Sequence, residues 1–86
     1  MTNPQQIRLF IKPDCGWCDE VMDWLDARGL AYEKLNVFTN AAARREMVER
    51  SGQTLAPVID VDGAMLADFG ADELEIWWRE QGFGPE

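Results

Sequence analysis

Two cysteines three positions apart, Cys15 and Cys18, constrain the fold of this 86-residue chain more than any other feature. They stand between a β-branched and aromatic run at residues 7–11 and a stretch beginning at Gly16 in which apolar residues recur at helical spacing. The chain is therefore expected to turn from a strand into a helix at the two thiols. The first N–H groups of a helix are unpaired and the helix dipole is positive there, so this position stabilises a thiolate at Cys15.

Two other uses of the cysteine pair are weaker. A structural disulfide between Cys15 and Cys18 would close a very short loop, which removes little entropy from the unfolded chain, and small secreted domains usually carry more cysteines. A zinc ion needs a full tetrahedral set of ligands, so this chain, which has no histidine, would have to add carboxylates or a second chain. We predict no metal site and a working dithiol, in which Cys15 attacks a substrate disulfide and Cys18, one helical turn deeper, resolves the product.

Composition narrows the function classes. Sixteen acidic residues against eight basic ones give a net charge of −8, which repels phosphate backbones, so we expect no nucleic-acid partner. The apolar runs are far shorter than the roughly 20 residues of a membrane helix. Residues 1–6 lack the basic flank and apolar stretch of a signal peptide. We expect one cytoplasmic domain over residues 1–86, monomeric and without a membrane partner.

Hydrophobic periodicity and turn residues predict the secondary structure. Strands are predicted at residues 7–11, 31–37, 57–61 and 64–67, and helices from Gly16 to a stop at Gly29, at 41–50 and at 71–81. Asp62-Gly63 is a strong hairpin signal, and Asn40 is a suitable N-cap for the second helix. The first half then forms a right-handed βαβ unit with parallel strands, and the second half adds an antiparallel hairpin covered by a helix. The residues predicted to be buried on helical faces include Trp24, Met47, Val48, Leu74, Trp77 and Trp78.

Three segments resemble, in order, motifs of one protein family. Residues 12–18, Lys-Pro-Asp-Cys-Gly-Trp-Cys, are similar to KPxCPYC; residues 51–57, Ser-Gly-Gln-Thr-Leu-Ala-Pro, to TGxxTVP; and residues 69–74, Phe-Gly-Ala-Asp-Glu-Leu, to GGxDDL. Together they resemble the glutaredoxin branch of the thioredoxin superfamily over nearly the whole chain. The resemblance implies a thioredoxin-like α/β fold of order βαβαββα, with a mixed four-stranded sheet flanked by three helices.

The resemblance also implies a groove for glutathione, a zwitterionic tripeptide. Pro57 matches the family's cis-proline, which turns the preceding backbone toward the dithiol, and Ala56 would then pair its N–H and C=O with the cysteine moiety of glutathione. Lys12 would meet the glycine carboxylate. Trp17 would provide a contact surface beside the dithiol, or merely cover it. Thr54 stands where the family often has a basic residue, which leaves fewer cations for that carboxylate.

The γ-glutamyl end of glutathione falls, by the same resemblance, at the start of the last helix. The N–H groups of Gly70, Ala71 and Asp72 would bind its carboxylate, and the Asp72 side chain would meet its ammonium. Considered without the family, several of these residues have ordinary structural uses. Asp72 suits an N-cap or a first-turn acid, Pro57 the start of an edge strand, and Lys12 the surface.

These expectations combine into one function and three alternatives. We predict a glutathione-dependent thiol–disulfide oxidoreductase, with glutathione as its co-substrate, that reduces disulfide-containing or glutathionylated proteins through Cys15 and Cys18. One alternative is a redoxin that is reduced by thioredoxin reductase. Another is a dimer that holds a [2Fe–2S] cluster through one Cys15 from each chain and two glutathione thiols, suggested by Gly16 in place of the family's proline. The third is an acidic interaction module without redox activity.

Overall fold

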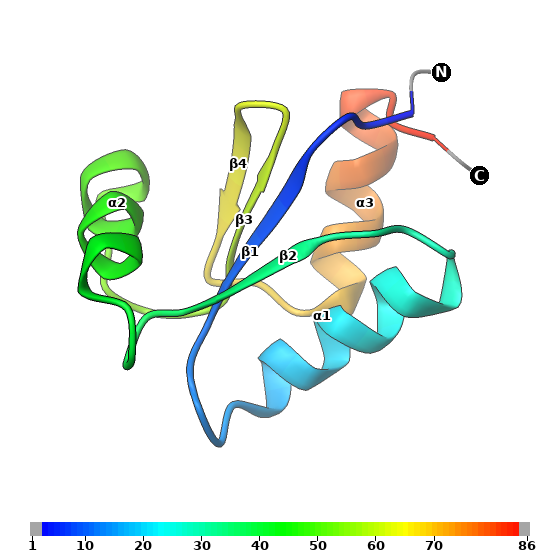
Figure 1. The fold of residues 1–86 in the computed structure, drawn as a ribbon. Helices are drawn as coiled ribbons and strands as arrows, with labels where there is room; N and C mark the ends of the chain where they lie inside the picture. The colour runs from blue at the N-terminus through cyan, green and yellow to red at the C-terminus, as the bar shows by residue number, and fades with distance from the viewer. Residues whose placement is uncertain (1–2, 85–86) are drawn as a thin grey trace.

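Seven secondary-structure elements follow one another in the predicted order in the computed structural model, which describes residues 3–84 (Figure 1). They are β1 (Ile7–Ile11), α1 (Gly16–Ala27), β2 (Glu33–Asn36), α2 (Ala41–Ser51), β3 (Val58–Val61), β4 (Ala64–Ala67) and α3 (Ala71–Gln81). Residues 1–2 and 85–86, which include part of the stretch that we judged not to be a signal peptide, lie outside the described residues.

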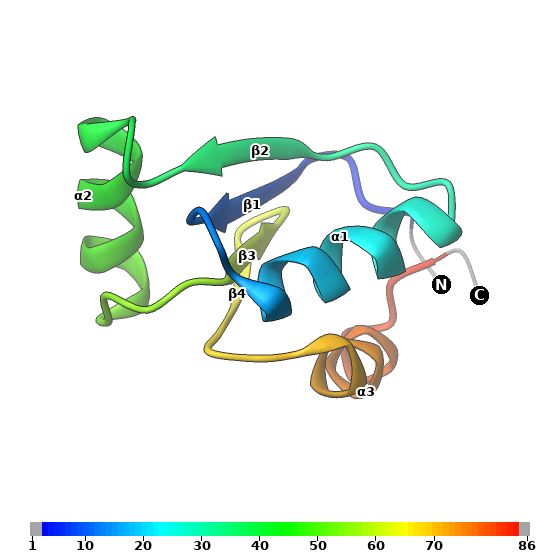
Figure 2. The same cartoon turned by 90° about the horizontal axis from the view of Figure 1, so that it is seen from below.

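The four strands form one mixed sheet in the order β2-β1-β3-β4. Strand β1 pairs with β2 in parallel and with β3 antiparallel, and the β3–β4 hairpin adds a second antiparallel pair. Figure 1 shows α2 on one side of the sheet and α1 with α3 on the other, and in Figure 2 these two helices lie side by side. The prediction of a thioredoxin-like fold, with three helices around a mixed four-stranded sheet, is confirmed.

Strand β1 separates two hydrophobic clusters. Ile7 and Leu9 are buried with α1 and α3, whereas Phe10 is buried in a second cluster on the α2 side. Successive side chains of a strand point to opposite faces, so each helix layer has its own core. Of the two α2 residues predicted to face inward, Met47 is fully buried and Val48 is half-buried. Burial of apolar surface in the two clusters holds the helices against the sheet, and α1 carries the dithiol.

Several elements begin or end at the residues that the short-range sequence signals predicted. The Asn40 side chain accepts the N–H of Ala43 at 3.0 Å and so caps α2, and Gly52, with a φ of 76°, ends that helix. In the hairpin, Asp62 and Gly63 have φ values of 51° and 96°. Both lie in the left-handed region that a tight two-residue hairpin turn requires.

The length of strand β2 and the burial of two tryptophans differ from the prediction. Strand β2 is shorter than predicted, because its pairing with β1 starts only where Glu33 lies opposite Arg8. The tryptophans of α1 and α3 are not equally buried: Trp78 lies in the core, whereas Trp24 and Trp77 pack against it and keep part of their surface in solvent. Large indole rings are rarely buried completely, and the Trp24 and Trp78 rings meet edge to face with centroids 5.3 Å apart.

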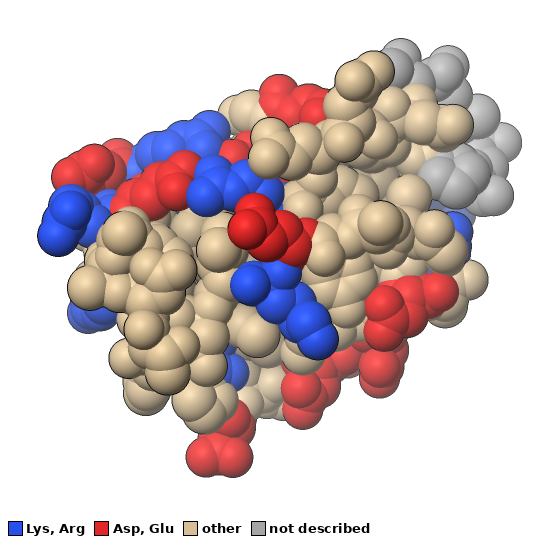
Figure 3. All heavy atoms as spheres, viewed as in Figure 1, with Lys and Arg blue, Asp and Glu red and all other residues tan. Residues whose placement is uncertain are grey.

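Ion pairs tie α2 to the sheet. Arg8 in β1 donates to both carboxylate oxygens of Glu46 in α2, at 2.6 and 2.7 Å. Arg50, also in α2, donates to Asp60 of β3, whose side chain is buried. Figure 3 shows acidic and basic side chains interspersed at the α2 end of the molecule, whereas acidic side chains predominate along the α1 side.

Replacing Glu46 with glutamine is expected to make the protein less sensitive to acid. The hydrogen bonds from Arg8 lower the pKa of Glu46 from 4.5 to about 2. Because this pKa is depressed in the folded state, the stabilisation is complete above pH 4.5 and is lost as the pH falls toward 2. Between pH 7 and pH 3 the wild type should lose about 1 kcal/mol more free energy of unfolding than Glu46→Gln, after allowance for solvent screening.

Urea unfolding at both pH values measures this difference. Glu49→Gln, at an exposed position of the same helix, is the matched control and should show the acid sensitivity of the wild type. If Glu46→Gln shows that same sensitivity, the Arg8–Glu46 pair does not act as described.

Candidate active site

The start of α1 carries both cysteines. Cys15 is the N-cap residue of the helix, and its Sγ accepts a hydrogen bond from the N–H of Cys18 at 3.1 Å. The chain reaches Cys15 through Asp14, whose φ of 54° lies in the left-handed region and turns the backbone out of the β1 direction. The dithiol therefore lies at the strand-to-helix turn, as predicted.

The two cysteines are joined in a disulfide, with their Cα atoms 5.2 Å apart. Cys15 is 8% exposed and Cys18 only 1%. Opening the disulfide therefore frees one sulfur near the surface and one inside the protein. Because the helix N-terminus also favours negative charge at Cys15, this asymmetry suits attack by Cys15 and resolution by Cys18.

Ala56 lies directly against the dithiol. It is buried in a small cluster with Cys15 and Cys18, and its peptide bond to Pro57 is cis, as the family resemblance implied. Within residues 3–84, no backbone hydrogen bond uses the N–H or C=O of Ala56. A peptide backbone beside Cys15 would therefore find both groups available for pairing, as in an added strand.

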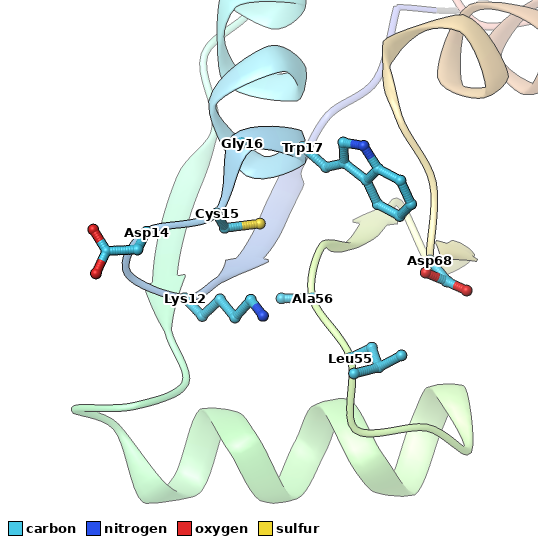
Figure 4. A pocket seen from close by; sticks show the side chains of 8 residues that line it. All are labelled: Lys12, Asp14, Cys15, Gly16, Trp17, Leu55, Ala56 and Asp68. Atoms are coloured by element: carbon cyan, nitrogen blue, oxygen red, sulfur yellow. The ribbon is translucent and has the colours of Figure 1, made fainter.

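A cavity of about 400 Å³ adjoins Cys15 (Figure 4). The residues that line it are Lys12, Asp14, Cys15, Gly16, Trp17, Leu55, Ala56 and Asp68. Figure 4 shows the Cys15 sulfur and the Lys12 amine pointing into the space between α1 and the segment of Leu55 and Ala56. Trp17 and Leu55 are 54% and 55% exposed, so the cavity has an accessible apolar rim. A concave surface that combines apolar side chains with polar groups is typical of ligand sites.

The structure brings together part of the predicted site. The predicted residues that line the cavity are Lys12, Cys15, Trp17 and Ala56. Cys18 and Pro57 are buried next to them. Gly70, Ala71 and Asp72, at the start of α3, are not among the lining residues.

The first turn of α3 already holds a carboxylate from α1. Oε1 of Glu20 accepts the N–H of Ala71 at 3.2 Å. Gly70 is the N-cap residue and has no side chain to cap the helix, and Asp72 lies in the first turn. Of the two structural uses predicted for Asp72, the first-turn acid is confirmed and the N-cap is wrong, because the helix already begins at Ala71.

Two residues of this region were not assigned to the site from the sequence: Asp68, which lines the cavity, and Glu20, which contacts the start of α3. Asp68 lines the cavity and has a φ of 55°. A signal existed for it, because it directly precedes the third motif and aspartate tolerates left-handed backbone. From the sequence alone, Glu20 is recognisable only as an acidic residue of the first helix, because Ala71, to which it is hydrogen-bonded, is 51 positions away. The other unassigned lining residues fall within the first two motifs and are Asp14, Gly16 and Leu55.

Two further predictions concern metals and membranes. Among residues 3–84, no group of three or more histidine, cysteine, aspartate or glutamate side chains could hold a metal ion. The helices of the same residues include none that is long and apolar enough to cross a bilayer.

The alternative of an iron–sulfur cluster shared by two chains would use the Cys15 sulfur as an iron ligand, and that sulfur is here bonded to Cys18. That alternative stays a prediction.

A disulfide-forming cysteine pair at the first helix of a thioredoxin-like fold defines a dithiol redox protein. The family model of the glutaredoxins matches residues 7–66, which is more than half of the chain. Glutaredoxin 3 of Escherichia coli K12 is 32% identical over 79 residues, which cover 92% of this chain and 93% of that protein. The chain therefore belongs to the glutaredoxin family of thiol oxidoreductases.

Solved structures share the fold. The thioredoxin-like protein BC3987 has a TM-score of 0.76 and 30% identity, covering 83% of this chain and 97% of that one. The NrdH-redoxin of Escherichia coli has a TM-score of 0.70 and 22% identity, with 84% and 93% covered. A buckwheat glutaredoxin in complex with glutathione has a TM-score of 0.68 and 22% identity, with 88% and 69% covered. At this identity the last two show the fold alone.

Proposed function

We propose that this protein is a glutathione-dependent thiol–disulfide oxidoreductase that acts through Cys15 and Cys18. The observation that carries the proposal is the more accessible Cys15 at the N-terminus of α1, which is bonded to a buried Cys18. Beside it lies Ala56, whose N–H and C=O form no backbone hydrogen bond in the described part of the chain. The buckwheat glutaredoxin, which has the same fold, was solved with glutathione bound, and this supports a glutathione site in the present chain.

Reduction of a glutathione mixed disulfide needs only Cys15. Its thiolate attacks the glutathione sulfur, so that the substrate disulfide breaks, the substrate thiolate leaves and is protonated by solvent, and a Cys15–glutathione disulfide forms. A second glutathione thiolate attacks the glutathione sulfur of this disulfide. Cys15 leaves as a thiolate and the two glutathiones leave as glutathione disulfide. The α1 dipole stabilises the Cys15 thiolate both as the nucleophile and as the leaving group.

Reduction of a protein disulfide uses both cysteines. The Cys15 thiolate attacks one substrate sulfur and forms a mixed disulfide, and the other substrate sulfur leaves as a thiol. The Cys18 thiolate then attacks Cys15, which releases the second substrate thiol and forms the Cys15–Cys18 disulfide. Two glutathione molecules reduce this disulfide and become glutathione disulfide, so the two electrons that the substrate gains come from glutathione.

In this proposal, residues that line the cavity hold the backbone and the glycine carboxylate of glutathione. The free N–H and C=O of Ala56 would hold the ligand backbone beside Cys15, and Trp17 would pack over it. Lys12, the only cation among the lining residues in the described part of the chain, would pair with the glycine carboxylate. The carboxylates of Asp14 and Asp68 oppose that pairing, which predicts modest rather than tight binding of glutathione.

A redoxin that is reduced by thioredoxin reductase is the second candidate, and a specific observation favours it. The α3 N-terminus, where the γ-glutamyl carboxylate would bind, already holds the carboxylate of Glu20. The NrdH-redoxin of Escherichia coli, described as a glutaredoxin-like protein with a thioredoxin-like activity profile, shares the fold.

Two coupled assays decide between the candidates. The oxidised protein is supplied either with glutathione, glutathione reductase and NADPH or with thioredoxin reductase and NADPH, and NADPH consumption is followed with a glutathione mixed disulfide and with a protein disulfide as substrates. We expect turnover at least about tenfold faster in the glutathione system. Preferential turnover with thioredoxin reductase would replace the proposal by the second candidate. Turnover in neither system would indicate an interaction module.

A further inference from the structure

We infer that Glu20 determines the specificity of this site by acting as a built-in competitor of the γ-glutamyl carboxylate of glutathione. Glutathione must displace Glu20 from the N-terminus of α3, whereas a polypeptide substrate, which has no free carboxylate at that end, need not. Glu20 therefore shifts the preference of the site from glutathione toward protein disulfides. The inference deepens the proposed function and rests on it.

The first observation is the bond itself. The first N–H groups of a helix have no partner within the helix and favour an anion. In α3 the N–H of Ala71 is taken by Oε1 of Glu20 at 3.2 Å, across the contact between α1 and α3. The Glu20 side chain is on the protein surface, so it is able to swing into solvent when another carboxylate competes for the same N–H.

The second observation is the crowding of negative charge around this terminus. Gly70 is buried, and a Cβ placed on it would lie 3.5 Å from Oε1 of Glu20 and 3.5 Å from Oε2 of Glu73. Two carboxylates therefore flank the helix start, and Asp72 follows in the same turn. An incoming carboxylate must replace one of them while it approaches the others, and like charges at such distances repel.

The third observation is where the cavity ends. Its lining reaches Trp17 and Asp68 on the side of α3 but does not include Gly70 or Ala71. Figure 4 shows the Trp17 ring extending toward the segment of Asp68. The accessible part of the groove thus serves the ligand near Lys12, Cys15 and Ala56, and the Glu20–Ala71 bond is formed by residues outside its lining.

Glu20→Ala, Glu20→Gln and a control test this inference. The control is Asp23→Ala, which removes an exposed negative charge from the same helix at a residue that forms no hydrogen bond or ion pair within residues 3–84. Each protein is assayed in the glutathione-coupled reduction of a mixed disulfide, and its Kd for S-methylglutathione is measured by NMR titration. We expect Glu20→Ala to lower KM and Kd about threefold to tenfold with kcat unchanged, Glu20→Gln to lie between, and Asp23→Ala to match the wild type.

A second measurement separates specificity from a general change in the dithiol. The pre-reduced proteins are mixed with a disulfide-bonded protein in a single turnover without glutathione, and the rate should stay within about twofold of the wild type for every variant. A Glu20→Ala protein that uses glutathione with the KM and Kd of the wild type would overturn the inference and leave the proposed function standing. Glutathione turnover by Glu20→Ala but not by the wild type would overturn glutathione dependence and support the inference. Turnover by neither would overturn both.

Discussion

Cys15→Ser should abolish the glutathione-dependent reduction of small mixed disulfides, with a loss of at least about a thousandfold, because the remaining thiol, that of Cys18, is buried and out of reach of the glutathionyl group. Cys18→Ser should keep a substantial part of this activity. The mixed-disulfide route passes only through Cys15, which is the more exposed of the two cysteines and caps α1. Turnover is measured with glutathione, glutathione reductase and NADPH.

The same pair of variants separates the two routes. With a protein disulfide as substrate, Cys18→Ser should stall as a mixed disulfide with its substrate, because the buried resolving thiol is missing. Mass spectrometry of the trapped species detects this adduct. Equal and mild losses in Cys15→Ser and Cys18→Ser would contradict the assignment of the two roles.

Phe69→Ala should cost about 3–5 kcal/mol of the free energy of unfolding, a large share of the stability of a domain of this size. Phe69 is 1% exposed and lies in the cluster formed by α1, α3 and the sheet. Its removal leaves a cavity that the surrounding helices and strands can fill only in part. Urea unfolding at pH 7 measures the change as a lower midpoint at an unchanged slope.

Phe38→Ala is the matched control, since the same side chain is deleted at a position that is 70% exposed. It should change the free energy of unfolding by less than about 0.5 kcal/mol. Similar losses in the two variants would mean that Phe69 is not part of the packed core.

Much of the fold can be predicted from the sequence because its signals act over short distances. Asn40 caps the helix that begins at the next residue, and Asp62-Gly63 turns the chain between two strands that touch it on either side. The last helix was predicted over residues 71–81 and is found at Ala71–Gln81, bounded by Gly70 and Gly82. Each of these signals concerns groups only a few residues apart, so no knowledge of the packing is needed to interpret them.

The dithiol belongs to the same category. Cys15 and Cys18 are one turn apart at a helix start, which brings their sulfurs together whatever else the chain does. The three motifs add Lys12, Trp17 and Ala56, and these residues do line one cavity with Cys15. They meet there because the segments that carry them, two loops and the first turn of α1, lie at the same end of the sheet, an arrangement that follows from the fold class.

The sequence by itself therefore determined the order of the elements, the fold class and the position of the dithiol. The tertiary structure alone decided that Glu20 contacts Ala71 and that Asp68 lines the cavity. It also decided how much of Trp24 and Trp77 stays in solvent. The physical reason is that these features depend on the detailed packing of α1 against α3. Glu20 and Ala71 are 51 positions apart in the sequence, and their contact requires the two helices to be placed to within the length of a hydrogen bond. Hydrophobic patterns state which face of a helix is buried, but not which side chain on its border reaches the neighbouring helix.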